Sequence, residues 1–408
     1  MPPKNPIFGP YAQDMQLHPT FSLTSLLDND FYKFTMQQGV VKLFPGAKAR
    51  YAFINRGKHV FPPGFSKALR ESVNEMASLK LSREEKLFLQ DNCPYLDPVY
   101  LDFLEGYRFN PEEVHIEQHG DQLEVHVEGL WYRTILWEVP LMALISELFY
   151  KLHHAVRLSD AEVIALTRKK IEGYVRLGVT VAEFGTRRRY AYDVHRLALK
   201  ALKDHGQGAF IGSSNVHMAM LYQTKPIGTH AHEWFMFHAA RYGFKMANAM
   251  GLQHWVEVFR GDLGIALSDT YTTEVFFKQF DKMYSKLFDG VRHDSGDALQ
   301  FADKVINHYH SLGIDPKTKT IIFSDGLNYD KVARIAAYCQ DKIGISFGIG
   351  TNLTNDVGPE PMNIVIKMTA AHPQDGEWTE VVKLSDEPGK HTGTEQAINL
   401  AKTILNIH

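Results

Sequence analysis

The segment 226–238, PIGTHAHEWFMFH, holds three histidines and a glutamate directly after a turn-forming Pro-Ile-Gly-Thr stretch. From Glu233 onward, apolar residues recur at helical spacing, so His230 and His232 lie where a loop enters a predicted helix. The N-terminus of a helix has unpaired N–H groups and partial positive charge, which favour phosphoryl groups. Because a neutral imidazole is a competent nucleophile, this segment is the first candidate for chemistry.

Three interpretations of these histidines compete. A metal site would use His230, His232 and Glu233 as ligands, but Met236 stands where the zinc-binding pattern H-E-x-x-H needs its second histidine. The ordinary alternative is that the histidines only bond to the loop backbone. The third interpretation is a histidine that accepts or contacts a phosphoryl group, and the remaining motifs decide between the three.

The segment RHDSGD, residues 292–297, combines groups that suit a phosphorylated sugar. Arg292 can hold a phosphate, and Asp294 can bind ribose hydroxyls or assist a magnesium ion through water. A structural interpretation competes, in which Asp294 or Ser295 caps the helix that begins near Asp297. Both interpretations can hold at once.

Two loops of small residues follow apolar stretches late in the chain. In GIGTN, residues 348–352, the glycines let the backbone approach a ligand, and successive N–H groups can form an anion-binding nest. In SDG, Asp325 stands at the centre of a second loop that exposes its backbone. Together the loops resemble the phosphate-binding corner that barrels form late in the chain, although a lone G-x-G is also typical of a simple tight turn.

The segment EFGTRRR, residues 183–189, places one aromatic ring beside three guanidinium groups. Phe184 can stack on a planar ligand while an arginine pairs with a carboxylate on that ligand. The alternative is a solvated basic start of a helix. A cationic first turn opposes the helix dipole, which favours the functional interpretation.

These polar segments follow predicted strands, where parallel α/β folds place their functional residues. From about residue 160, amphipathic helices alternate with short apolar strands, which indicates a parallel sheet with covering helices. Roughly six such units favour an irregular, incomplete (β/α) barrel. The predicted strands are 179–185, 208–214, 255–260, 289–294, 319–326 and 342–350.

The first part of the chain has a different pattern. Residues 48–56 alternate like a strand, and residues 111–130 alternate around a turn like a β-hairpin. Strand-like runs return near the C-terminus, and we expect them to rejoin this N-terminal β region. The predicted domains are an N-terminal α+β domain over 1–138 with a C-terminal return over 360–408, and a barrel-like α/β domain over 139–359.

Composition restricts the class of protein. The chain has 408 residues, of which 44% are hydrophobic and 22% charged, as in an ordinary globular protein. A net charge of −3 gives no general attraction to nucleic acid or membranes, so any anion site must be built locally. No window approaches the roughly 18 apolar residues of a membrane span. Two isolated cysteines and no secretory signal favour the cytoplasm.

Taken in chain order, the motifs resemble those of nicotinate phosphoribosyltransferases, in the shorter type that lacks clustered zinc-binding cysteines. The matching motifs are DNDFYKFTM, EFGTRRR, GSSNVH, GTHAHEW, RHDSGD, FSDGL, FGIGTNL and KLSDEPGK. The resemblance implies an N-terminal domain, an irregular barrel and a homodimer with shared active sites. It also implies transfer of phosphoribosyl from phosphoribosyl pyrophosphate to nicotinate in NAD salvage, giving nicotinate mononucleotide and pyrophosphate. The transfer would be coupled to ATP hydrolysis and would need Mg²⁺.

The resemblance implies roles for individual residues. His232 matches the histidine that ATP phosphorylates. Arg292 and Asp294 match residues that contact the phosphate and ribose, and with His232 they form the predicted catalytic set. Phe184 matches an aromatic residue that stacks on the pyridine ring, and Arg187 matches an arginine close to the ring substituent.

Further substrate contacts follow from the same resemblance. Tyr32 matches a tyrosine that the neighbouring subunit contributes to the other face of the ring. Arg56 and Lys390 resemble cations that are brought across the dimer to the pyrophosphate. Gly350 and Thr351 match the backbone phosphate loop, and Asp325 belongs to the second small-residue loop. No protein ligand for the magnesium ion is assigned.

The choice of pyridine substrate depends on Ser214, which stands where nicotinamide phosphoribosyltransferases have an aspartate. A carboxylate there would repel nicotinate, whereas serine can donate to its carboxylate, so we expect nicotinate as substrate. Two alternatives remain at this point: the same scaffold acting on nicotinamide, and a non-catalytic phosphosugar-binding protein. The presence of His232, Arg292 and Asp294 argues against the second.

Overall fold

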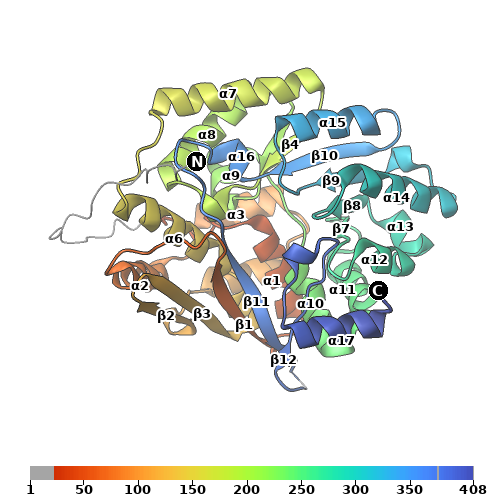
Figure 1. Ribbon diagram of the computed structural model, residues 1–408, viewed down its shortest axis with the longest axis horizontal. Coiled ribbons are helices and arrows are strands. Elements are labelled where there is room, and N and C mark those ends of the chain that lie inside the picture. Colours follow the sequence, from red (N-terminus) through yellow and green to blue (C-terminus); the bar gives the residue numbers. More distant parts are fainter. Residues whose placement is uncertain (1–22, 375, 408) are drawn as a thin grey trace, which may run out of the picture.

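The computed structural model describes residues 23–374 and 376–407 (Figure 1). Two sheets organise this part of the chain, and the segments that form them are interleaved in the sequence. A parallel sheet is built from the middle of the chain, and an antiparallel sheet combines N-terminal with C-terminal strands. The α/β class with an N-terminal α+β region is therefore confirmed.

The parallel sheet has seven strands in the order β6-β5-β4-β10-β9-β8-β7. The two edge strands β6 and β7 do not pair with each other, so the sheet is a curled half-barrel, as the incomplete barrel predicted from the sequence requires. The strands are β4 (Val181–Glu183), β5 (Phe210–Ser213), β6 (Lys225–Pro226), β7 (Ile265–Leu267), β8 (Gly290–His293), β9 (Thr320–Phe323) and β10 (Gly344–Ile349).

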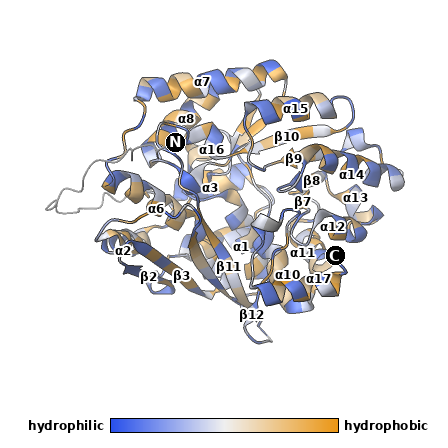
Figure 2. Cartoon of the chain, viewed as in Figure 1, coloured by the Kyte–Doolittle hydropathy of each residue, from blue (hydrophilic) through white to orange (hydrophobic). Residues whose placement is uncertain are grey.

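Helices connect these strands and cover the sheet. In Figure 2 the outer helices α7 and α15 alternate between hydrophilic and hydrophobic residues, whereas β10 beneath them is mostly hydrophobic. The helices are α7 (Asp160–Leu177), α8 (Tyr192–His205), α9 (Val216–Leu221), α10 (His232–Tyr242), α11 (Ala247–Phe259), α12 (Thr273–Gln279), α13 (Lys282–Leu287), α14 (Ala298–Ser311), α15 (Tyr329–Cys339) and α16 (Thr351–Thr354). Among the described residues, no helix is long and apolar enough to cross a membrane.

One predicted strand is wrong. Residues 255–260 belong mainly to α11, where Trp255 and Phe259 lie one turn apart with ring centroids separated by 4.4 Å and ring planes tilted by 43°. The alternating apolar residues of this stretch also fit a buried helix, in which the large side chains of Trp255 and Phe259 pack in the core. The strand of this unit is the shorter β7, which follows α11.

The cap of α14 also differs from the expectation. The carboxylate of Asp297 accepts hydrogen bonds from the backbone N–H groups of Leu299 and Gln300, so Asp297 is itself the N-cap. The interpretation of Asp294 or Ser295 as the cap is therefore wrong. Both side chains remain available for contacts at the end of the sheet.

The antiparallel sheet has the order β12-β11-β1-β3-β2, and its central pairing joins β1 to β11, with Ala49 opposite Ala371. The C-terminal return predicted from the sequence is thus present, while the domain boundaries at 138 and 360 remain predictions. The strands are β1 (Lys48–Asn55), β2 (Val114–His119), β3 (Gln122–Leu130), β11 (Ile364–His372) and β12 (Thr379–Glu380). The accompanying helices are α1 (Phe31–Leu43), α2 (Phe65–Glu75), α3 (Arg83–Asn92), α4 (Pro98–Gly106), α5 (Trp131–Thr134), α6 (Glu138–Leu152) and α17 (Glu395–Leu405).

Candidate active site

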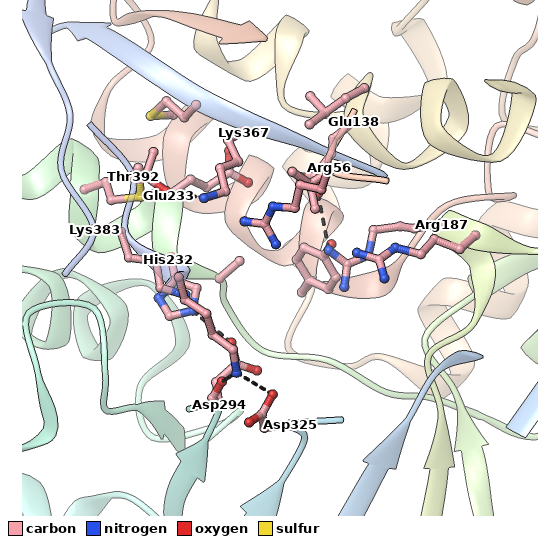
Figure 3. A pocket seen from close by; sticks show the side chains of 18 residues that line it. Arg56, Glu138, Arg187, His232, Glu233, Asp294, Asp325, Lys367, Lys383 and Thr392 are labelled. Carbon is pink, nitrogen blue, oxygen red and sulfur yellow. Dashed lines mark hydrogen bonds and ion pairs between the residues drawn. The ribbon is translucent and has the colours of Figure 1, made fainter. Parts of the chain in front are cut away.

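Two adjoining cavities of about 310 and 320 Å³ lie where the carboxyl ends of the parallel strands face the antiparallel sheet. Their shared lining residues join them into one site: Tyr32, Arg187, Arg188, Ala231, His232 and Asp294. Figure 3 shows Arg56 and Lys367 across the first cavity from Asp294 and Asp325. The site is therefore bounded by two walls, one from the half-barrel and one from the antiparallel sheet.

His232 is the first residue of α10 and lines both cavities. Its Nε2 lies 3.0 Å from Asp294 Oδ2 and 3.6 Å from Asp269 Oδ1, and its Nδ1 lies 3.1 Å from Thr270 Oγ1. An ionised carboxylate only accepts hydrogen bonds, so we infer that Nε2 carries the proton and that Nδ1 presents a lone pair. Burial, helped by the charge of Lys383, lowers the pKa of His232 more than the two carboxylates raise it. The imidazole is therefore neutral at pH 7.

His230 has a different environment, although it is only two residues away. It is fully buried, with its ring edge-on to Phe235 and Trp255, and its Nε2 accepts a hydrogen bond from the backbone N–H of Leu267 at 3.2 Å. Burial lowers the pKa of His230 far below the usual range. His230 is thus a structural histidine, whereas the side chain of His232 is 17% exposed and faces the cavity.

Asp294 directly follows β8 and holds the imidazole of His232 in place. Its second oxygen, Oδ1, accepts a hydrogen bond of 2.8 Å from Ser324 Oγ at the end of β9. Burial favours the neutral acid, but the hydrogen bond from His232 and the charges of Arg292 and Lys383 outweigh it and hold the pKa well below the usual range. Asp294 is therefore a fixed negative charge beside the histidine.

Phe184 and Tyr32 both line the second cavity and can offer aromatic rings to a planar ligand. The part of the cavity that these two residues line is called the ring slot below. The guanidinium of Arg187 lies 3.4 Å from Glu138 Oε1 and 3.8 Å from Asp30 Oδ2. Tyr32 and these two carboxylates raise the pKa of Arg187. Because the Arg187 side chain is still 41% exposed, it keeps donors for a carboxylate on the ligand.

The loop after β10 approaches this slot through two glycines. A Cβ atom on Gly348 would lie 3.3 Å from the ring of Phe184, and one on Gly350 would lie 2.9 Å from the carbonyl oxygen of Phe184. Gly350 and Thr351 also line the second cavity, together with Arg292, whose Nε is a buried donor without a partner among the described residues. Backbone N–H groups and a free guanidinium donor together suit a phosphate.

The opposite wall supplies cations. The set consists of Arg56, Lys367, Lys383 and Lys390, while Arg188, which follows β4, adds a guanidinium from the half-barrel side. Lys390 pairs with Asp325 at 2.5 Å and with Glu387 at 2.9 Å, so it ties the two walls together. Lys367 instead donates to neutral oxygens, and burial with the charges of Arg56 and Lys383 lowers its pKa to about 8.

Asp269 is a functional candidate that the sequence did not reveal. It follows β7, is buried, and lies within 4.8 Å of ligand atoms of His232 and Asp294. Its Oδ2 accepts from the hydroxyls of Ser295 and Ser385, while its Oδ1 is buried without a hydrogen-bond partner among the described residues. An unsatisfied carboxylate oxygen at this position suits a cation.

Comparison with known proteins decides which family has this geometry. Residues 27–146 match the model of the nicotinate phosphoribosyltransferase N-terminal domain, and residues 179–408 match the model of the nicotinate phosphoribosyltransferase family. The chain belongs to the nicotinate phosphoribosyltransferase family. Its function as an enzyme of this class, predicted from the sequence motifs, is thereby confirmed.

Individual relatives agree along almost the whole chain. The nicotinate phosphoribosyltransferase of Chromohalobacter salexigens is 63% identical over 383 residues, which are 94% of this chain and 98% of that protein. The Methanosarcina acetivorans enzyme is 43% identical and covers 94% of this chain and 98% of its own length. A crystal structure of nicotinate phosphoribosyltransferase from Porphyromonas gingivalis has a TM-score of 0.92 at 44% identity, covering 94% of this chain and 100% of that chain.

Eleven of the twelve substrate and catalytic residues predicted for this nicotinate phosphoribosyltransferase line one or both cavities. The exception is Ser214, which is fully buried and does not line either cavity. Its hydroxyl donates to Asp30 Oδ1 at 2.8 Å, and Asp30 Oδ2 in turn faces Arg187. Ser214 therefore lies behind Arg187, and its effect on the ring substituent is indirect.

The residues expected to be shared between subunits also line the site of their own chain. Tyr32, Arg56 and Lys390 line the cavity of their own chain, together with His232 and Asp294. The helix α1 that carries Tyr32 packs against its own half-barrel, where the backbone N–H of Phe31 donates to the carbonyl of Ser214. One chain can therefore place these side chains at its own site, and the prediction that subunits share their sites stays a prediction.

Proposed function

We propose that this family member couples the transfer of phosphoribosyl from phosphoribosyl pyrophosphate to nicotinate to the hydrolysis of ATP, through phosphorylation of His232. The contrast between the two neighbouring histidines carries the proposal. His232 is neutral, accessible and oriented by Asp294, whereas His230 is buried and already bonded to the backbone. An ATP γ-phosphoryl group can reach only the first of them.

The geometry favours Nδ1 as the nucleophile, because Nε2 is occupied by its hydrogen bond to Asp294. The Nδ1 lone pair attacks the γ-phosphorus, an N–P bond forms, the bridging P–O bond breaks, and ADP leaves with that electron pair. The hydroxyl of Thr270, 3.1 Å from Nδ1, must rotate away as the phosphoryl group arrives. Water then cleaves the N–P bond and restores the enzyme.

Ribosyl transfer needs positioning and charge stabilisation more than a protein base. The pyridine nitrogen attacks the anomeric carbon with its own lone pair, and the C–O bond to pyrophosphate breaks, so negative charge develops on the leaving group. Nicotinate would lie between Phe184 and Tyr32 with its carboxylate on Arg187. The leaving pyrophosphate would face the cations of the opposite wall, of which Arg56 and Lys367 are examples.

Magnesium is part of the proposal, and the residues present fit it. Asp269 and Asp294 offer carboxylate oxygens close together, and the unsatisfied Oδ1 of Asp269 supports a cation there. Bound Mg²⁺ would neutralise phosphate charge in both half-reactions. A cytoplasmic location is also proposed, supported by Cys93 and Cys339, which are both buried and free.

Labelling with γ-³²P-ATP followed by peptide mapping tests the proposal. We expect an acid-labile, base-stable label on His232 that is absent in His232→Ala, while slow ATP-independent formation of nicotinate mononucleotide persists. His230→Gln keeps an acceptor near the position of Nε2 and should retain the label. Label on His230, or undiminished labelling of His232→Ala, would refute the assignment, and phosphohistidine analysis should identify the Nδ1 isomer.

A further inference from the structure

Lys33, on helix α1, is a charged residue that lies entirely inside the protein. Its Nζ pairs with Glu138 Oε2 at 2.5 Å and also with Glu233 Oε1. Both carboxylates line the first cavity, although the ligands proposed for that cavity are anions. Two negative charges at an anion site require an explanation, and a buried lysine that joins them supplies part of it.

Each carboxylate uses its second oxygen to hold a group on one side of the site. Glu138 Oε1 faces the guanidinium of Arg187 at 3.4 Å. Glu233 Oε2 accepts from Tyr51 OH at 2.8 Å, and Glu233 is the residue directly after His232 in the first turn of α10. A continuous chain of charged contacts therefore runs from the first turn of the histidine helix, through Lys33, to the arginine of the ring slot.

We propose that Lys33 is a positioning residue that links the phosphorylation state of His232 to the placement of Arg187, and so couples ATP use to the binding of nicotinate. The part of this proposal that concerns ATP rests on the proposed function. The linkage acts through Glu233 on one side and Glu138 on the other. Lys33 also follows Tyr32 in sequence, so the same helix turn carries the ring-facing tyrosine.

The charges of the chain favour a rigid linkage. Burial opposes the charge on Lys33, but the two glutamates outweigh it and raise its pKa, so the lysine stays protonated. The charges of Lys33 and Arg187 balance those of Glu138 and Glu233. Separating a buried ion pair of this kind is costly, because it leaves an unpaired charge inside the protein. A shift of the first turn of α10 on addition of a dianionic phosphoryl group would therefore be transmitted to Glu138 and Arg187.

Two variants test the linkage, and in both of them Glu138 keeps the guanidinium of Arg187 as a charged partner. Glu233→Gln keeps the shape of the side chain but removes its charge, and Lys33→Met/Glu233→Gln removes one complete ion pair. The matched control is Lys86→Met, which removes a lysine that pairs with Asp102 and Glu105 at the surface. Lys33→Arg, which keeps a charged bridge, is the conservative variant that should retain coupling.

The measurement is the KM for nicotinate and the kcat at saturating phosphoribosyl pyrophosphate, each with and without ATP. We expect both Gln-containing variants to raise the KM for nicotinate, the double variant by about tenfold with a smaller change in kcat, and both to lose the ATP-dependent decrease in this KM. Without a linkage, removal of the negative charge of Glu233 beside an anion site would instead lower the KM for nicotinate. The two explanations thus predict opposite signs for Glu233→Gln.

The proposal is overturned if both Gln-containing variants keep the wild-type KM and its response to ATP, or if Lys33→Arg behaves like the double variant. If the KM of the wild type for nicotinate is the same with and without ATP, the ATP coupling of the proposed function is refuted instead. In that case the KM without ATP still decides whether Lys33 positions Arg187. Thermal unfolding identifies a variant that fails to fold. If the double variant does not fold, the isosteric Glu233→Gln variant still tests the linkage.

Discussion

His232 and Arg187 on the half-barrel wall and Lys367 on the opposite wall handle charge in opposite ways. On the half-barrel wall, charged groups are paired with one another, as in the contact of His232 with Asp294 and in the contacts of Arg187 with Glu138 and Asp30. On the wall formed by β11 and the segment after it, Lys367 donates only to neutral oxygens, to which it is bonded at 3.1 and 2.6 Å.

The pKa shifts record this difference. The pKa of Arg187 is raised by its neighbours, whereas burial and nearby cations lower the pKa of Lys367 to about 8. Paired groups on a rigid sheet edge are pre-organised to orient reacting atoms. Cations that lack a counter-charge gain most when an anion arrives, so their wall is suited to hold and release pyrophosphate.

The largest effect is expected on the half-barrel wall, from Asp294→Asn. The amide keeps the shape but no longer fixes the Nε2 proton of His232, and it removes a negative charge from the proposed magnesium site. We expect kcat/KM to fall by about 10²–10³-fold and phosphorylation of the enzyme to be lost. The control is Asp303→Asn, a change at an exposed carboxylate that accepts from Tyr338 OH. A loss below about tenfold would place Asp294 outside the reaction.

The opposite wall should respond to pH through Lys367. Pyrophosphate binds the protonated amine of Lys367 better than the neutral amine. The affinity for phosphoribosyl pyrophosphate should therefore be full below pH 8 and fall as the pH rises through about 8, which is the pKa of Lys367 in the protein without ligand. Lys367→Met should raise the KM for phosphoribosyl pyrophosphate about ten- to a hundredfold at pH 7. Lys367→Arg should move the alkaline limb of the kcat/KM profile to higher pH, and an unmoved limb would assign it to another group.

A smaller effect is expected behind the half-barrel wall, from Ser214→Ala. The change removes the hydrogen bond to Asp30 and so weakens the hold of that carboxylate on Arg187. We expect the KM for nicotinate to rise by less than about tenfold, with the KM for phosphoribosyl pyrophosphate unchanged. An effect as large as that of Arg187→Ala would mean that Ser214 touches the ligand itself.

The half-barrel wall was the more predictable of the two. Its residues stand directly after parallel strands, so the local pattern of apolar run and polar loop located His232, Asp294 and Gly350 in advance. Asp269 was missed because the preceding helix segment 255–260 resembles a strand and was predicted as the strand of this unit in place of β7.

The other wall depends on contacts that no local pattern contains. Lys367 reaches the site because β11 pairs with β1, more than 300 positions earlier in the chain, with Tyr51 opposite Met368. Glu138 and Lys33 were missed for the same reason, since their contact joins two helices that lie far apart in the chain. Arg56 and Lys390 were located only by family resemblance, and the expectation that they cross a dimer stays a prediction.

The smallest expected effect concerns the sharing of active sites across a dimer. Tyr32→Ala and Arg187→Ala each remove one side of the ring slot, and both residues line the cavity of one chain. Mixing the two inactive variants should therefore give no recovery of activity. If subunits shared their sites, exchange would form mixed dimers with one intact site each and restore up to roughly a quarter of wild-type activity. Sedimentation of the mixture at assay concentration, with one variant fluorescently labelled, shows whether chains associate and exchange. Recovered activity would show that Tyr32 serves a partner subunit, whereas none despite exchange would show that each chain holds a complete site.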